Sequence, residues 1–248
     1  DEQVKLEQFL VDEFPRRQEG DPLALGEVDA PVVLTEWADY RCPFCSVWAE
    51  ETLPRLQPLI DDGTLRVEFR DLAIFGDESI RAATAARAAG VQGHYFEFAH
   101  ELFVALPNEG HPDIPDELVF GIVEQLGLDL EQFKTDWADP AHQEAVLADS
   151  QEAQSMGISS TPSFVIGSQF VAGALPIEEF QEIIRQQAGL AGRCWSATPV
   201  PSSEAWRRSS APARRCCCPP SSPTRSVVTA PGCSAAPHCS ISACCSLS

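Results

Sequence analysis

Residues 1–192 of this 248-residue chain are poor in cysteine and in basic side chains. Of the ten cysteines, only Cys42 and Cys45 fall in this part, and the other eight lie in residues 193–248. A cysteine count over the whole chain would therefore wrongly suggest a disulfide-rich protein. No run reaches the roughly 18 apolar residues of a membrane-spanning helix, and the 15 glycines show no collagen-like period. These absences favour a globular domain with a buried core.

The two parts of the chain also differ in charge. Residues 193–248 contain six arginines and one glutamate, a net charge of +5, whereas the whole chain carries −20. Residues 1–192 therefore carry −25. Such a surface repels phosphate backbones and anionic membranes, so we expect no nucleic-acid partner.

The first regular pattern is a buried strand followed by a turn and a helix. Residues 31–38 are apolar, β-branched or aromatic with little polar alternation, as in a strand buried on both faces. The apolar spacing over 42–60 predicts a helix that kinks at Pro54 and stops at 61–63. A second strand, with alternating apolar positions, is predicted over 65–72.

Helical periodicity dominates the following stretch. The predicted helices cover residues 78–89, 92–106, 115–126, 130–137 and 140–156. Residues 163–167 and 169–173 then predict a hairpin, and residues 176–187 predict a last helix with a buried apolar face. The order β, α, β, helices, β, β, α indicates an α/β fold with a mixed central sheet and an all-helical insertion.

The C-terminal tail, residues 191–248, has a different composition. Its last 56 residues hold 8 cysteines, 8 prolines and 13 serines, with no apolar period, so we expect this tail to be disordered. A disulfide-rich module is the alternative, but such modules space their cysteines, and here residues 216–218 and 244–245 are adjacent cysteines. A further hypothesis is a shifted reading frame, because residues 215–224 back-translate into an apolar, membrane-like stretch in a neighbouring frame.

The strongest chemical signal is Cys42-Pro43-Phe44-Cys45, placed where the first predicted strand is followed by a helix. The free N–H groups and positive dipole of a helix start stabilise a thiolate, which lowers the pKa of the first cysteine. Proline suits the first helical turn because no N–H is needed there. Two intervening residues keep the sulfurs within one turn, so that a disulfide can form and break. We therefore predict that Cys42 attacks and Cys45 resolves.

Two alternatives to a redox role for this cysteine pair are a zinc site and a pair of inert buried thiols. A zinc site needs further cysteines or histidines at ligand spacing, and the four histidines of residues 1–192 do not have it, so we expect no metal. Two inert buried cysteines would not explain their position at a helix start with a proline between them.

Two motifs carry a family resemblance. Residues 36–45, Glu-Trp-Ala-Asp-Tyr-Arg-Cys-Pro-Phe-Cys, and residues 157–164, Gly-Ile-Ser-Ser-Thr-Pro-Ser-Phe, resemble those of DsbA-like thiol–disulfide oxidoreductases of the thioredoxin-fold superfamily. The resemblance spans about residues 20–188. It implies that Pro162 is cis and faces the cysteines, while the backbone of Thr161 pairs with an extended client.

The resemblance also assigns roles around the cysteines. It implies that Glu36, six residues before Cys42, lies beneath Cys45 and accepts its proton, with a pKa raised by burial. The alternative is a salt-bridged or exposed glutamate. The predicted client-binding residues are Pro43, Phe44, Thr161 and Pro162. Four aromatic residues near the cysteines are predicted to form either an apolar rim for unfolded clients or part of the core: Trp37, Tyr40, Phe44 and Trp48.

With this resemblance the chain divides into a lead-in, a thioredoxin-like domain in two parts, an insertion and a tail. The predicted segments are 1–19, with an amphipathic helix over 1–14, then 20–77 with the cysteines, 78–156 as the helical insertion, 157–190 with the cis-proline loop, and the tail 191–248.

The function implied by the resemblance is exchange of disulfides with cysteine-containing client proteins by an exported bacterial enzyme that needs no metal or organic cofactor. Phe44 stands where strongly oxidising members carry histidine, and it cannot donate a hydrogen bond to Cys42. We predict a potential less oxidising than the roughly −120 mV of DsbA, with oxidase and reductase directions both open. A membrane redox partner is expected. If the tail is a mis-framed neighbour that encodes an apolar membrane protein, an electron donor of the CcdA type is the expected partner, which would favour the reductase direction. An export signal or anchor is expected to precede Asp1 or to have been removed.

Two alternative functions share the fold. One is a thioredoxin-like binding module for unfolded proteins, whose cysteines form a structural disulfide and which shows no turnover. The other is a relative of the glutathione transferases, whose one-cysteine chemistry has no use for a resolving cysteine.

Overall fold

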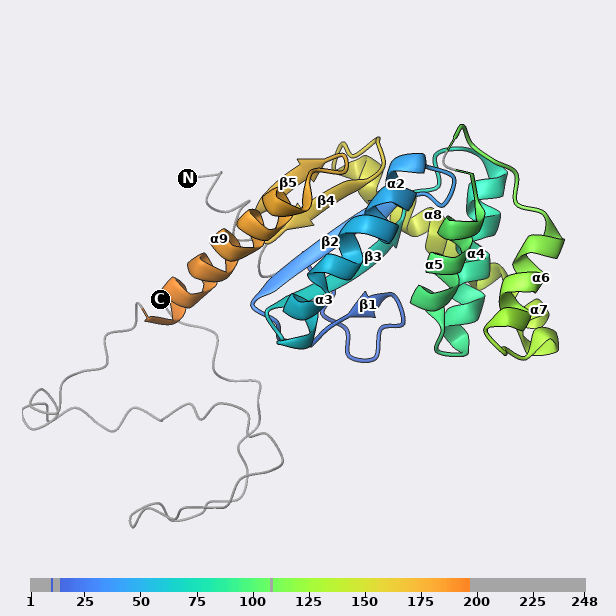
Figure 1. Ribbon diagram of the computed structural model, residues 1–248, viewed down its shortest axis with the longest axis horizontal. Coiled ribbons are helices and arrows are strands. Elements are labelled where there is room, and N and C mark those ends of the chain that lie inside the picture. The colour runs from blue at the N-terminus through green and yellow to red at the C-terminus, as the bar shows by residue number, and fades with distance from the viewer. Residues whose placement is uncertain (1–9, 11–13, 108, 197–248) are drawn as a thin grey trace, which may run out of the picture. The chain divides into compact units, whose positions relative to one another are not determined.

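The computed structural model describes residues 10, 14–107 and 109–196, drawn as the coloured ribbon in Figure 1. The chain divides into two units, residues 1–199 and 200–248, and the fold below belongs to the first. The helix predicted over 1–14 lies outside the described residues except for residues 10 and 14, and so does the reading-frame hypothesis for 215–224.

A five-stranded mixed sheet forms the centre of the first unit, in the order β1-β3-β2-β4-β5. The strands are β1 (Ala24–Leu25), β2 (Val32–Ala38), β3 (Leu65–Asp71), β4 (Ser163–Ile166) and β5 (Gln169–Ala172). β2 and β3 run parallel, and the other neighbours are antiparallel. All seven residues of the central strand β2 are buried, as its lack of polar alternation predicts. β1 has no sequence signal because two residues carry no periodicity.

The helices follow the predicted order. They are α2 (Pro43–Val47), the π-helical turn η1 (Trp48–Thr52), α3 (Leu53–Asp61), α4 (Asp77–Val91), α5 (Tyr95–Ala105), α6 (Asp116–Gln125), α7 (Leu130–Trp137), α8 (Pro140–Ser155) and α9 (Ile177–Ser196). The five helices between β3 and β4 agree with the prediction to within three residues at each end. They form the helical insertion, beside the sheet in Figure 1.

One predicted boundary is wrong, and one predicted irregularity lies at a different position. α9 continues to Ser196, so the predicted start of a disordered tail at residue 191 falls inside a helix, since no proline interrupts the chain before Pro199. The irregularity expected at Pro54 lies earlier, in η1. A proline ring inside a helix clashes with the carbonyl four residues before it. The wider π turn of η1 relieves this clash, and Pro54 lies in the first turn of α3.

The two faces of the sheet are covered differently. α3 and α9 lie across one face, as Figure 1 shows, and pack on apolar side chains. This core contains Val32, Leu34, Leu56, Ile60, Leu65, Val67, Phe164, Ile166, Phe180 and Ile184. On the other face, Trp37 and Val165 pack with Ala153 of α8. Because side chains alternate along a strand, Glu36 points to the same face as Leu34, toward α2 and α3.

A buried ionic layer accompanies β3. Its sequence alternates, but all seven residues are buried, the charged ones included. Arg66 donates to Glu68 at 3.0 Å, and Arg70 donates to Glu152 of α8 at 2.5 Å. Arg87 of α4 bridges Asp71 at 2.7 Å and Asp149 at 2.6 Å. The strand can therefore bury charge because each charged side chain has a partner.

Within the described residues, no helix has both the length and the apolar character needed to cross a bilayer.

Candidate active site

The turn between β2 and α2 is built around a buried aspartate. The Cys42 N–H donates to the Asp39 carbonyl at 3.0 Å. The Asp39 carboxylate accepts from the N–H groups of Arg41 at 2.8 Å, Ile74 at 2.9 Å and Phe75 at 3.3 Å. Burial raises the pKa of Asp39, and these hydrogen bonds oppose that rise. The turn is thus fixed to the loop after β3, and Cys42 becomes the N-cap of α2.

Cys42 occupies the helix start that the sequence predicts. It has an extended backbone, Pro43 follows at the first helical position, and both cysteines are free thiols. The pKa of Cys42 is lowered to about 6, first because the Cys45 thiol donates to it. Burial opposes the change, and the Thr161 side chain and the N–H groups of Cys45 and Phe44 add to it. A large part of Cys42 is therefore thiolate at neutral pH.

The loop before β4 lies against Cys42 although it is 119 residues away in sequence. The Thr161–Pro162 peptide bond is cis, as the resemblance predicts. The Cys42 Sγ lies 3.4 Å from the Thr161 carbonyl oxygen. The Pro162 carbonyl accepts from the Gly173 N–H at 2.8 Å, which joins the loop to the end of β5. Thr161, Pro162 and the two cysteines are therefore brought together.

Cys45 and Glu36 form the interior of the site. Both are almost fully buried. Burial raises the pKa of Cys45 well above its ordinary value, and Cys42 and Glu36 raise it further. Burial also raises the pKa of Glu36 well above the usual range, and the charge on Cys42 adds to this. No ion pair to Glu36 occurs within residues 14–107 and 109–196, so the alternative of a salt-bridged or exposed glutamate is not what the structure has.

The four aromatic residues around the cysteines do not share one role. Trp37, Tyr40 and Trp48 are buried core residues, so of the two alternatives the core, and not the apolar rim, holds for these three. They pack against other rings, such as Trp48 on Phe164 at 5.1 Å. Phe44 alone of the four projects outward, 63% exposed. The period of α2 explains this, because Phe44 lies on the side of the helix away from the sheet.

Two features of the site carry no recognisable sequence signal. Arg41 extends its guanidinium to three backbone carbonyls of neighbouring loops. The hydroxyl groups of Tyr40 and Tyr95 are 3.0 Å apart in the interior, beneath the turn. Both depend on segments that meet only in the folded chain, so residue spacing could not reveal them.

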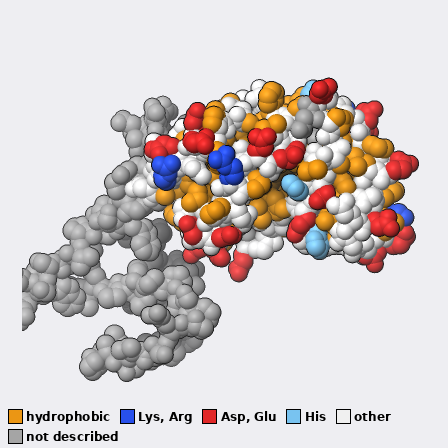
Figure 2. All heavy atoms as spheres, in the orientation of Figure 1, with side chains coloured by type: hydrophobic (Ala, Val, Ile, Leu, Met, Phe, Trp, Pro, Cys, Tyr) orange, Lys and Arg blue, Asp and Glu red, His pale blue; other side chains and the backbone are white. Residues whose placement is uncertain are grey.

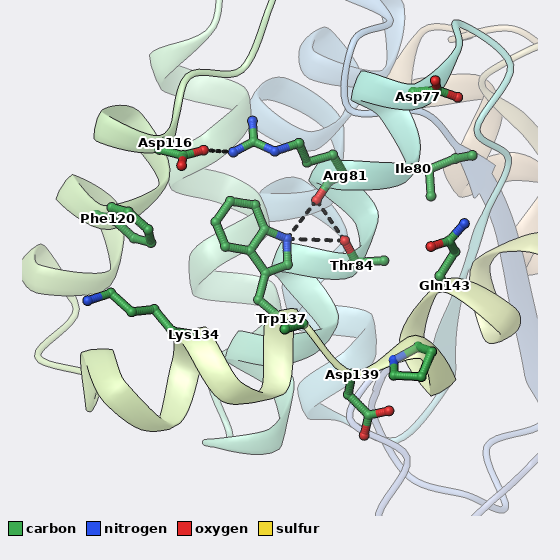
Figure 3. Close-up of a pocket in the computed structure, with 12 residues that line it drawn as sticks. Asp77, Ile80, Arg81, Thr84, Asp116, Phe120, Lys134, Trp137, Asp139 and Gln143 are labelled. Carbon is green, nitrogen blue, oxygen red and sulfur yellow. Dashed lines mark hydrogen bonds and ion pairs between the residues drawn. The ribbon is translucent and has the colours of Figure 1, made fainter.

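A hollow lies in the helical insertion. It has a volume of about 600 Å³ and lies between α4, α6, α7 and the start of α8, as Figure 3 shows. At its centre the Trp137 indole N–H donates to the Arg81 carbonyl and to Thr84, each at 3.1 Å. No cysteine lines it. In the described residues, no group of three or more potential ligands could hold a metal ion.

Comparison with known proteins places the chain in a family. Residues 18–186 match the thioredoxin family model. A probable disulfide bond formation protein D of Bacillus anthracis is 32% identical over 148 residues, covering 58% of this chain and 68% of that protein. The crystal structure of oxidised BdbD from Bacillus subtilis has a TM-score of 0.63 and 25% identity, and the match covers 69% of this chain and 94% of BdbD.

A membrane protein also contains a related region. The Na⁺/H⁺ antiporter NhaA 1 of Mycobacterium sp. strain KMS is 31% identical over 156 residues. The match covers 58% of this chain but 23% of the antiporter, so it concerns a small part of that protein.

The chain belongs to the thioredoxin family. With its mixed sheet, its relatives and its structural neighbours, it is a protein-disulfide oxidoreductase of the DsbA-like class. Within that class it is similar to the disulfide bond formation proteins D of Bacillus.

Proposed function

We propose that residues 42–45 are the redox-active centre and that the enzyme oxidises pairs of cysteines in client proteins. One observation carries the proposal. The Cys42 thiol, with a pKa of about 6, lies 3.4 Å from the Thr161 carbonyl beside the cis bond to Pro162. A reactive sulfur thus adjoins backbone to which an extended peptide can pair. The names of the Bacillus relatives, disulfide bond formation proteins, support the oxidising direction.

The proposed reaction begins from a Cys42–Cys45 disulfide. A client thiolate attacks Cys42 Sγ, and the electron pair of the breaking S–S bond passes to Cys45, which takes up a proton. A second client thiolate attacks the client sulfur of this mixed disulfide, forming the client disulfide and releasing Cys42 as a thiolate. Two electrons have then moved from the client to the enzyme. Cys42 is a good leaving group because its pKa is about 6.

We assign the proton transfer at Cys45 to Glu36. This carboxyl is buried on the face of β2 toward α2, and its raised pKa favours the protonated form that a proton donor needs. It donates to Cys45 in the oxidising direction and accepts when Cys45 attacks. Replacing Glu36 by the isosteric glutamine should slow the step at Cys45 by about 100-fold in single-turnover measurements. An unchanged rate would remove Glu36 from the mechanism.

The redox potential should lie in the middle of the family range. A thiol pKa of about 6 falls between those of thioredoxin, about 7, and DsbA, about 3.5. A more stable thiolate makes the enzyme more oxidising, so we propose a potential between about −270 and −120 mV. Equilibration with a glutathione series measures it. The chain should carry serine in place of the eight cysteines after residue 193, so that only Cys42 and Cys45 titrate.

The oxidising reaction also needs a compartment and an electron acceptor. We propose that the enzyme works outside the bacterial cytoplasm, where disulfides persist. A membrane redox protein would return its cysteines to the disulfide form. Clients are proteins with at least two cysteines.

The direct test uses the full chain with its tail cysteines replaced by serine. The oxidised enzyme should form a disulfide in a reduced two-cysteine peptide. Cys42→Ser should abolish turnover. Cys45→Ser cannot form the internal disulfide, but its Cys42 thiolate should attack the disulfide of the oxidised peptide and accumulate as a mixed disulfide that gel electrophoresis without reductant detects. A binding module with a structural disulfide would show no turnover in any of these proteins, which would overturn the proposal.

A further inference from the structure

Arg41, the residue before Cys42, holds the loops around the site together. Its guanidinium donates through Nε to the Pro112 carbonyl at 2.7 Å, through Nη1 to the Phe75 carbonyl at 2.6 Å and through Nη2 to the His111 carbonyl at 2.6 Å. Its side chain is 10% exposed. These three acceptors are backbone carbonyls, and Nη2 also lies 3.4 Å from the Asp113 carboxylate of the same loop, so the arginine fixes the path of two loops.

The backbone of Arg41 is held as well. Its N–H donates to Asp39, and its carbonyl accepts from Nδ1 of His111 at 2.9 Å. A carbonyl can only accept, so this histidine nitrogen carries the proton. The His111 ring stacks on Phe75 with 3.6 Å between ring centroids. The active-site turn, the loop before α4 and the loop between α5 and α6 thus meet at Arg41.

One of these loops forms a wall beside the reactive sulfur. Cys42 lies at a small crevice with Pro43 and Ser46 on one side. Leu106, Pro107 and Pro112, from the end of α5 and the loop after it, line the other side. Because Cys42 is only 4% exposed, access to its sulfur depends on where this wall stands. Arg41 holds the wall at Pro112 itself.

We propose that Arg41 is a positioning residue for client binding, which holds the loop between α5 and α6 in place beside Cys42 and thereby sets the affinity for the client peptide. The inference rests on the proposed function. The groups that stabilise the Cys42 thiolate are Cys45, Thr161 and nearby backbone N–H groups, and Arg41 is not among them. Loss of Arg41 should therefore weaken client binding and leave thiol activation unchanged.

The test compares Arg41→Met and Arg41→Lys in the full chain with tail cysteines replaced by serine. With oxidised glutathione present to regenerate the enzyme disulfide, Arg41→Met should raise KM for a reduced two-cysteine peptide about tenfold, since charge-assisted hydrogen bonds are lost, and leave kcat within about twofold. The pH midpoint of iodoacetamide alkylation should not move. Arg41→Lys should give a smaller rise in KM, because lysine keeps the positive charge. A rise should remain, because an ammonium cannot reproduce the planar fork of three donors. Arg55→Met, which removes an exposed arginine paired with Glu178, is the matched control and should change nothing.

A variant on the loop side separates this role from a general structural one. His111→Ala removes the stack on Phe75 and the bond to the Arg41 carbonyl, so it should raise KM in the same way. If both residues hold one wall, the double variant should raise KM by less than the product of the single effects.

An unchanged KM in Arg41→Met and Arg41→Lys, or a shift of the alkylation midpoint by more than about one pH unit, would overturn the inference. Multiplicative effects in the double variant would do so too. If Arg41→Met fails to fold, Arg41→Lys and His111→Ala still decide the question. If only this inference fails, the enzyme with both cysteines is still active and Cys42→Ser is still inactive. If the proposed function fails, neither protein shows turnover.

Discussion

The two cysteines of the CPFC motif are three residues apart, and their surroundings move their pKa values in opposite directions. The Cys45 thiol, the Thr161 side chain and the N–H groups at the start of α2 favour the Cys42 thiolate, and together they outweigh the effect of its burial on the pKa. Cys45 lies deeper, next to Glu36, and burial dominates. One sulfur is therefore ionised and the other protonated at neutral pH, as nucleophile and resolving group require.

We expect the alkylation rate of the reduced enzyme with iodoacetamide to rise with pH around a midpoint near pH 6, where Cys42 ionises. Only the thiolate reacts, so the rate falls as the pH drops below this midpoint. The measurement uses the chain with serine in place of the tail cysteines, and Cys42→Ser should lack the transition. A midpoint near 8.5, the ordinary value for cysteine, would contradict the assignment of the nucleophile.

Among the elements, the segment α2-η1-α3 connects the site to the core. α2 is short and presents the cysteines at its start, whereas Trp48 of η1 and Leu56 of α3 are fully buried against the sheet. α9 packs beside them on the same face. Phe180 of α9 contacts Phe164 at 5.0 Å and Trp48 at 6.2 Å between ring centroids. This aromatic cluster holds the active-site helix on β4, the strand that follows the cis-proline loop.

Phe180→Ala should lower the free energy of unfolding by about 3–5 kcal/mol, because a fully buried ring leaves a cavity. Urea denaturation monitored by circular dichroism measures the change. Phe170→Ala is the matched control on β5, where the ring is 51% exposed, and should cost no more than about 0.5 kcal/mol. Equal costs for the two variants would mean that α9 does not stabilise the site as the packing indicates.

In the whole unit, several positive charges are internal. Four arginines of residues 1–192 have side chains that are at most 11% exposed: Arg41, Arg66, Arg70 and Arg87. Figure 2 accordingly shows acidic side chains spread over the visible face, with few lysines and arginines. Five acidic side chains, Glu36, Asp39, Glu68, Asp71 and Asp149, are buried as well, so the surface keeps the strongly negative net charge of residues 1–192 and should attract basic client segments at low salt.

The buried ionic layer makes stability depend on pH. Burial raises the pKa of Asp71 to about 6, and Asp149 adds to this, although Arg87 opposes it. An unfolded aspartate titrates near 3.9, so the folded state binds the proton more tightly. The protonated Asp71 therefore adds about 2–3 kcal/mol to the free energy of unfolding at low pH. This contribution is lost as the pH rises from about 4 to 6.

Asp71→Asn should remove this dependence. Between pH 4 and pH 7 the wild type should lose about 2 kcal/mol of unfolding free energy that the variant does not lose. Urea unfolding at several pH values measures it, with Asp62→Asn, a fully exposed aspartate, as the control. A constant difference in unfolding free energy between variant and wild type across this range would show that Asp71 is ionised in both states.

Much of the fold follows from local patterns. The lack of polar alternation in β2, the helical periods after β3 and the hairpin around Gly167 each predict their elements, because burial on one or both faces imposes a pattern on the residues. The position of Cys42 at a helix start follows in the same way. The π turn and the true end of α9 do not, since proline and helix-compatible residues permit several boundaries.

The residue patterns alone predict the element order, the cysteine pair at a helix start and, through family resemblance, the loop at Pro162. Which aromatic residue faces outward, how Glu36 is buried and what Arg41 binds become visible only in the folded chain. These features depend on segments far apart in the chain, such as residues 41 and 112, which meet through packing of the insertion against the sheet. Local periodicity reports which face of an element is buried, but it does not identify the partner that buries it.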